Sequence, residues 1–196
     1  MKKRWEKVRF GNVCESRLGK MLDAKQQTGE NRRKYLRNAN VQWDWLDLSE
    51  LFEMDFNKKD RDIFKMKYGD LLICEGGEVG RSAIWRNELP ECYFQKALHR
   101  VRPNPQKTTS EYLLHLMWFF SRNNGLKDHV SSATISHLTG IKLKDMIIPL
   151  PPIDLQKTCS QYYFKSKTLK EKLQILLTKS SNMFHAIRQR AFLGEL

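Results

Sequence analysis

Basic side chains are concentrated near the start of this sequence. Residues 1–40 contain twelve lysines and arginines but four acidic residues, whereas acidic residues outnumber basic ones in residues 41–80. Lysine and arginine neutralise nucleic-acid phosphates, although such a charge also suits an anionic membrane surface or simple solubility. Because the charge is polarised along the chain, we favour a partner with a phosphate backbone. The lysines and arginines expected in this interface are Lys20, Lys25, Arg32, Arg33, Lys34 and Lys96.

Side chains that could read the edges of bases lie in the same half of the chain and in one later segment. Asn and Gln can form two hydrogen bonds with adenine, and Arg can do so with guanine. A single exposed Asn is more often a turn former than a base contact, so the set matters more than any one member. The set is Arg37, Asn38, Asn40, Arg81, Gln95 and Arg100, with Ser132, Thr134, Ser136 and His137 in a small polar loop that could enter a groove.

Motifs of catalysis are missing from the sequence. It contains no G-x-x-x-x-G-K-[ST] loop, no H-E-x-x-H pair and no G-x-S-x-G elbow. The glycine-rich segment 76–80 follows an expected strand but precedes no helix, so we interpret it as a hairpin turn. Asp70 and Glu75 flank that strand as nuclease carboxylates might, yet Asp70 is better explained by the turn Gly69-Asp70. We therefore expect no catalytic residue, no metal and no cofactor.

Length and composition suggest a folded protein of one domain plus an appendage. The chain has 196 residues, a formal charge of +13 and 40% hydrophobic residues, which is too apolar for a disordered protein. No apolar run approaches the 18 or so residues that span a membrane, and the first residues lack the apolar region of a secretory signal. Four scattered cysteines then indicate buried, reduced thiols and a cytoplasmic location.

Alternating patterns predict a mostly antiparallel β domain with short helices. A polar, basic stretch, residues 19–34, has no period and is expected to be a long exposed loop. Thr108 with Glu111 resembles a capping box and predicts the start of a helix. The expected strands are 5–10, 34–41, 71–74 paired with 81–85, 93–101 and 147–150, and the expected helices are 56–66 and 108–121.

The end of the chain predicts one long helix. After Pro151-Pro152, with Asp154 as a possible cap, ten positions step by four and three in turn, which is a heptad seam. A helix over 154–193 would be about 60 Å long at about 1.5 Å per residue, too long to be buried by the rest of the chain. It must pack against another helix. The seam is Leu155, Cys159, Tyr162, Ser166, Leu169, Leu173, Leu176, Ser180, Met183 and Ile187.

Several stretches, taken in order, resemble the specificity (S) subunits of type I restriction-modification systems. They are W-E-K-V-R-F-G-N-V at 5–13, Y-L-R-N-A-N-V at 35–41, G-D-L-L-I with E-G-G-E-V-G-R at 69–81, the P-L-P-P segment with Leu155-Gln156, and A-F-L-G-E-L at 191–196. The resemblance covers the whole chain. Each of the five motifs is weak by itself, but together they occur in the order that is typical of the family.

The resemblance implies an α+β target recognition domain, here residues 1–153, followed by a long coiled-coil helix of the conserved region, here 154–196. It implies recognition of double-stranded DNA at one half of a split site, with methyl transfer and cleavage carried out by separate methyltransferase (M) and restriction (R) subunits. This chain has one such domain and one such helix, half of a typical subunit. The implied partner of the helix is a second copy or the second half of an S subunit. Two other interpretations stay open: a small nuclease acting alone, and an interaction protein that uses the helix as an oligomerisation rod.

Overall fold

The computed structural model describes residues 5–23, 27–127 and 137–195. The fold is α+β, with mostly antiparallel strands followed by a long C-terminal helix, as the sequence predicts. The chain forms two compact units, Met1–Gln156 and Lys157–Leu196, and the first turn of the long helix belongs to the first unit.

A four-stranded antiparallel sheet forms the centre of the first unit. Its order is β2-β10-β7-β8, and the glycine-rich segment closes the β7–β8 hairpin as expected. All four residues of β7 are buried because alternate side chains enter different cores: Leu71 and Ile73 one, Leu72 and Cys74 the other. The strands are β2 (Cys14–Leu18), β10 (Leu98–Pro103), β7 (Leu71–Cys74) and β8 (Ser82–Ile84).

A second, three-stranded sheet contains the three consecutive basic residues Arg32, Arg33 and Lys34. Its order is β6-β3-β9, with β3 antiparallel to β6 but parallel to β9. Phe56, which follows β6, stacks on Tyr93 of β9 with ring centroids 4.3 Å apart. The expected loop 19–34 is therefore shorter in the structure, since Arg32 already starts β3 and Lys20 bridges to Gln95. The elements are β3 (Arg32–Leu36), β6 (Phe52–Asp55), β9 (Tyr93–Phe94) and α1 (Lys58–Phe64), with a small hairpin of β4 (Val41–Gln42) and β5 (Trp45–Leu46).

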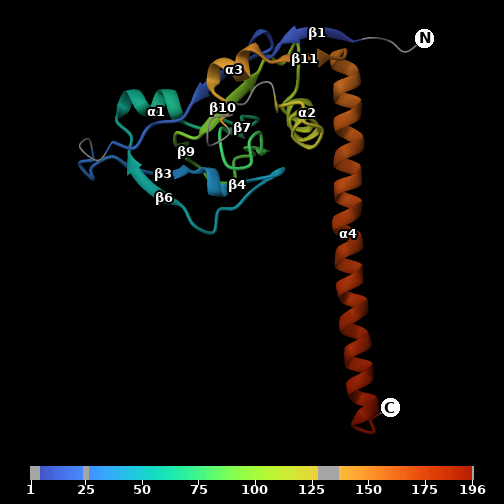
Figure 1. Cartoon of the computed structure of the whole chain (residues 1–196). Helices are drawn as coiled ribbons and strands as arrows, with labels where there is room; N and C mark the ends of the chain where they lie inside the picture. Colours follow the sequence, from blue (N-terminus) through green and yellow to red (C-terminus); the bar gives the residue numbers. More distant parts are fainter. Residues whose placement is uncertain (1–4, 24–26, 128–136, 196) are drawn as a thin grey trace. The chain divides into compact units, whose positions relative to one another are not determined.

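The two ends of the first unit meet. Strand β1 (Glu6–Arg9) pairs with β11 (Ile147–Leu150) in a two-stranded sheet, and Figure 1 shows these strands side by side. Short helix η1 (Phe10–Asn12) follows β1, while α2 (Ser110–Arg122) and α3 (Gly140–Asp145) contribute Leu113, Met117 and Leu143 to the adjoining core.

The cap of α2 differs from the prediction by one residue. Thr109, not Thr108, accepts the hydrogen bond from the backbone N–H of Tyr112. Thr108 instead donates its hydroxyl to the Gln156 side chain (3.0 Å), whose amide in turn donates to the carbonyls of Lys107 and Pro151. Gln156 is 1% exposed, so this amide ties the start of the long helix to the loop before α2.

The long helix is α4 (Ile153–Phe192), 40 residues in one unbroken element (Figure 1). It starts one residue before Asp154, which lies in the first turn rather than at the cap. Gly194, with φ +72°, ends it in a Schellman motif: the Glu195 N–H donates to Arg190 O and the Gly194 N–H to Ala191 O. Cys159, on this helix, is exposed, whereas Cys14, Cys74 and Cys92 are buried thiols as predicted. No helix among the described residues is long and apolar enough to cross a membrane.

Candidate nucleic-acid interface

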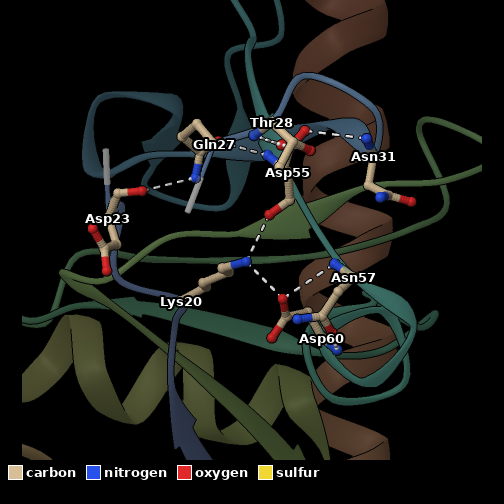
Figure 2. Close-up of polar contacts among 8 residues, drawn as sticks. All are labelled: Lys20, Asp23, Gln27, Thr28, Asn31, Asp55, Asn57 and Asp60. Carbon is tan, nitrogen blue, oxygen red and sulfur yellow. Dashed lines mark hydrogen bonds and ion pairs between the residues drawn. The ribbon is translucent and has the colours of Figure 1, made fainter. Parts of the chain in front are cut away.

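The Asp55 carboxylate at the end of β6 fixes the shape of the loop before β3. It accepts hydrogen bonds from the N–H of Asn31 (3.2 Å) and the hydroxyl of Thr28 (2.9 Å), as Figure 2 shows. It also accepts the backbone N–H of Gly29 (2.7 Å). Burial alone would raise the pKa of Asp55, which is 5% exposed, but the bonds from Gly29, Thr28 and Asn31 outweigh it and hold that pKa below its usual value. The Asp55 carboxylate therefore holds residues 28–31 of this loop in place through hydrogen bonds.

Lys20 binds two acidic residues at the base of the same loop, Asp55 and Asp60, and is not free to contact phosphate. Its ammonium donates to the Asp55 carbonyl (2.6 Å) and to Asp60 Oδ2 (2.6 Å), and its side chain is 13% exposed (Figure 2). Asp60 also accepts the N–H of Asn57 at the start of α1. The sequence prediction that Lys20 belongs to the interface finds no support in this position.

Replacing Asp55 by Asn should loosen the loop before β3. The amide places an N–H₂ where donors converge, so the backbone N–H groups of Thr28, Gly29 and Asn31 should lose hydrogen-exchange protection while those of β7 keep theirs. Because the folded pKa of Asp55 is lowered, its stabilisation is full above about pH 3.9, the ordinary Asp value, and disappears as pH falls below it. The Tm difference between wild type and Asp55→Asn should shrink over that acid range; a constant difference would contradict the charge-based account.

Exposed basic side chains project from the elements that this loop positions. Arg32 and Lys34 alternate with inward residues on β3 and are exposed, as is Lys96 after β9. Arg33 is half-buried, and its guanidinium lies 3.3 Å from Glu91. Gln95 is half-buried and lies beside the end of β3, because its N–H donates to Leu36 O. Arg32, Lys34 and Lys96 are therefore available at the surface, whereas Arg33 already has a carboxylate partner.

Three separate chain segments meet at the Glu75–Arg81 turn between β7 and β8. Asn38, in the short helix η3 (Asn38–Asn40), donates its amide to Gly76 O (2.9 Å). Arg81 donates to Asn38 O (3.0 Å), and the Leu138 N–H donates to Glu75 O (2.8 Å). Gly77 has φ +70°, and a Cβ there would approach the Asn38 amide to 3.2 Å. The turn therefore brings together residues that are far apart in the sequence.

Ion pairs and one aromatic ring hold Arg81, which lies in this turn, and Arg37, which precedes Asn38. Arg81 lies 3.6 Å from Glu78, whose other oxygen accepts the indole N–H of Trp43 (2.6 Å). Arg37 pairs with Glu50 (2.8 Å) and stacks 3.4 Å from the ring centroid of the exposed Phe52. The aromatic residues Trp43 and Phe52 were missed at the sequence level, although aromatic side chains within an acidic stretch are a signal for arginine partners.

Polar atoms of Arg81, in this turn, and of Arg37 and Asn38, beside it in the fold or the chain, are buried without a hydrogen-bond partner in the described part of the chain: Arg37 Nε, Asn38 Oδ1 and Arg81 Nε. An unpaired buried polar group costs about 1–3 kcal/mol, so such atoms are rare in positions selected for stability alone. Comparable atoms lie at Ser16, Ser82, His99 and Arg100, so this feature alone does not distinguish the turn.

Two predicted base contacts point into the protein. Asn40 is 3% exposed, and its amide donates to Asp47 O (2.9 Å) and Glu50 O (2.8 Å). Arg100 is 3% exposed and donates to Glu15 Oε1 (2.8 Å) and Ile63 O (2.8 Å). Both side chains are committed to the fold, and their positions do not support a role in base contact.

The remaining predicted residues divide into one described and four undescribed ones. His137 is exposed and directly precedes Leu138, which binds the Glu75–Arg81 turn. Lys25, Ser132, Thr134 and Ser136 lie outside the described residues.

The carboxylate considered for metal-dependent cleavage has a structural use. Asp70 is 1% exposed, forms a two-pronged pair with Arg102 (2.7 and 2.8 Å) and accepts the Lys67 N–H that closes the turn. Within residues 5–23, 27–127 and 137–195, no cluster of three metal-ligating side chains occurs. The chemistry that this surface offers is hydrogen bonding, stacking and charge neutralisation.

Comparison with known proteins gives one family. The sequence model of the type I restriction modification DNA specificity domain (Methylase_S) matches residues 2–182. A putative type I restriction enzyme MjaX specificity subunit of Methanocaldococcus jannaschii is 27% identical over 159 residues, which cover 78% of this chain and 37% of that protein.

Two solved structures share the fold over the whole chain. The HsdS subunit of Thermoanaerobacter tengcongensis has a TM-score of 0.63 at 20% identity, with 46% of its own chain covered. A chain from a study of complex assembly and conformational transition of the type I R-M system has a TM-score of 0.66 at 20% identity, with 47% covered. The chain thus spans about half the length of these relatives, or less.

Proposed function

Since the chain belongs to the family of type I restriction-modification DNA specificity domains, we propose that it recognises one half of a split site in double-stranded DNA. The observation that carries the proposal is the meeting of Asn38 and Arg81 at one turn, with Arg37 next to Asn38 in the chain and a nearby strand that exposes Arg32 and Lys34. Guanidinium and amide groups of side chains read the edges of nucleobases. Exposed lysine and arginine side chains beside them hold a duplex in place through its phosphates.

The two parts of the chain then have different tasks. Residues 1–153 are the target recognition domain, and 154–196 are a spacer helix that pairs with a second helix, from another copy or from the second half of an S subunit. The whole assembly would include methyltransferase (M) and restriction (R) subunits and would work in the cytoplasm, where the chromosome lies. Support for the pairing comes from the exposed seam of α4, in which Leu169, Leu173 and Leu176 are 58%, 51% and 60% exposed.

Two kinds of substitution should separate positioning from reading. Arg32→Ala with Lys34→Ala removes exposed charge, so binding should weaken alike for every duplex. Gln95→Ala or His137→Ala should change the preferred base at a particular position, with each lost two-bond contact costing about 1–3 kcal/mol. The measurement is affinity for a bound duplex and for its single-base variants.

A matched control removes two other exposed lysines, Lys7 on β1 and Lys144 on α3. The double Ala variant has the same loss of charge as the Arg32/Lys34 variant but should bind nearly as wild type. Equal weakening in both double variants would mean that net charge, and not this surface, binds DNA.

The chain alone should not change DNA covalently. Family members of this kind leave chemistry to partner subunits, and the Asp70 carboxylate that a nuclease would need is held by Arg102. Incubation of target duplex with the purified chain and either S-adenosylmethionine or Mg²⁺ should leave the DNA unmethylated and uncut. Turnover that rises in step with protein purity would favour the nuclease alternative.

A further inference from the structure

The spacing of the seam residues of α4 would allow this helix to pack against a second copy of itself. Positions 155, 162, 169, 176 and 183 alternate with 159, 166, 173, 180 and 187, and the series is symmetric about residue 171. In an antiparallel pair, Leu169 therefore faces Leu173 of the other helix. The small Ser180 likewise faces the large Tyr162. Packing along the seam alone does not distinguish a second copy from a different helix with the same spacing.

The residues that flank the seam do distinguish them. In the heptad, position a is occupied by Ser166, Leu173 and Ser180. The preceding residue is in each case a lysine at position g: Lys165, Lys172 and Lys179. Lys170, which follows Leu169 at position d, occupies position e. All four lysines are exposed. The whole of α4 has eight basic residues and two acidic ones, and Glu171, at the outward position f, cannot compensate across the seam. The g and e positions set partner choice in coiled coils.

An antiparallel pair of identical helices would oppose these charges. In the register that the symmetric seam dictates, Lys172 meets Lys172, Lys165 meets Lys179 and Lys170 meets Lys170. A parallel pair would bring Lys165 against Lys170. Like charges at such positions destabilise a pair and select against it.

We propose that the natural partner of α4 is a helix with the same seam spacing but with aspartate or glutamate at its g positions, and not a second copy of this chain. The inference rests on the proposed function for the helix but concerns only which partner it takes. A second half with acidic g positions would satisfy the apolar seam and the lysines at g, since each Lys–Lys pair at g becomes a Lys–carboxylate pair.

The test uses the full chain and a variant that imitates such a partner. The flank variant carries Lys165→Glu, Lys172→Glu and Lys179→Glu. The outer variant carries Lys157→Glu, Lys167→Glu and Arg188→Glu, three equal charge reversals away from g and e. Sedimentation velocity then compares each protein alone with 1:1 mixtures of wild type and either variant, all without DNA.

Wild type mixed with the flank variant should form a heterodimer at least about tenfold tighter than any dimer of wild type alone, because three repulsive pairs become attractive. Wild type with the outer variant should gain much less. A wild-type homodimer as tight as the mixture, or no gain in the mixture, would overturn the proposal. So would a loss of duplex binding by the flank variant well beyond that of the outer variant, since it would assign these lysines to DNA. Failure to find sequence-specific DNA binding would not affect the sedimentation result.

Discussion

Duplex binding by this chain should weaken about a thousandfold between about 50 and about 200 mM salt if some six phosphates are contacted. The chain has a net charge of +13, and Arg32, Lys34 and Lys96 stand exposed on the elements around the proposed reading surface. Each contacted phosphate releases bound counterions, and that release loses its free-energy gain as the salt concentration rises. Fluorescence anisotropy with a labelled duplex over a salt series measures the slope directly.

The Arg32→Ala/Lys34→Ala variant is the internal standard for that slope. Two lost phosphate contacts should reduce the slope of log affinity against log salt by about two. Wild-type affinity that stays flat over the salt series would contradict the electrostatic part of the account. An unchanged slope in the variant would move the phosphate contacts to other residues.

Removing one heptad from α4, Leu169–Ile175, should shorten the spacing between two half-sites by about three base pairs. The deletion keeps the seam in phase and shortens the helix by about 10 Å at about 1.5 Å per residue. At about 3.4 Å per base step along the duplex, this equals roughly three base pairs. The duplex also rotates by about a quarter turn over that length, at about ten pairs per turn. The shortened pair should therefore prefer a shorter spacer or lose bipartite binding while each half keeps weak affinity.

The mixture of wild type and the flank variant supplies a defined pair for this experiment, with the same heptad removed from both chains. Two identical recognition domains related by a two-fold axis should select an inverted repeat, so the spacer can be read from the selected duplexes. Glu171→Ala, at an outward position within the deleted segment, is the control and should keep the original spacer. An unchanged spacer at full affinity after the deletion would mean that the helix does not set the distance.

Sequence patterns correctly predicted the helices and strands that are determined by residues close together in the chain. The alternating steps of four and three predicted α4 to within one residue at each end, because a long helix repeats its own signal over ten turns or so. The β7–β8 hairpin followed from an apolar run and a glycine-rich turn, both contained in 14 residues of sequence, 71–84. The cap of α2 was displaced to Thr109 because Thr108 serves Gln156, a contact that spans 48 residues.

The parts that sequence could not give depend on contacts between distant residues. Arg100 looked like a base reader, yet it pairs with Glu15, 85 residues away, inside the central sheet. Lys20 looked like a phosphate contact until Asp60 was found beside it, 40 residues away. Residue type states which bonds a side chain can form, but only the fold decides whether the partner is a carboxylate of the same chain or a ligand. The meeting of Asn38, Arg81 and Leu138 at one turn is of the same kind.

Selection of duplexes from a random pool by the purified chain at low salt tests the central claim most directly. Sequence-specific recognition predicts that successive rounds enrich one short motif, and that Gln95→Ala changes the motif at a single position while Arg32→Ala/Lys34→Ala lowers recovery without changing it. A pool that stays random while binding persists would show that the chain holds DNA only by charge, and would contradict the assignment of a reading surface formed by Gln95 and the neighbouring Glu75–Arg81 turn.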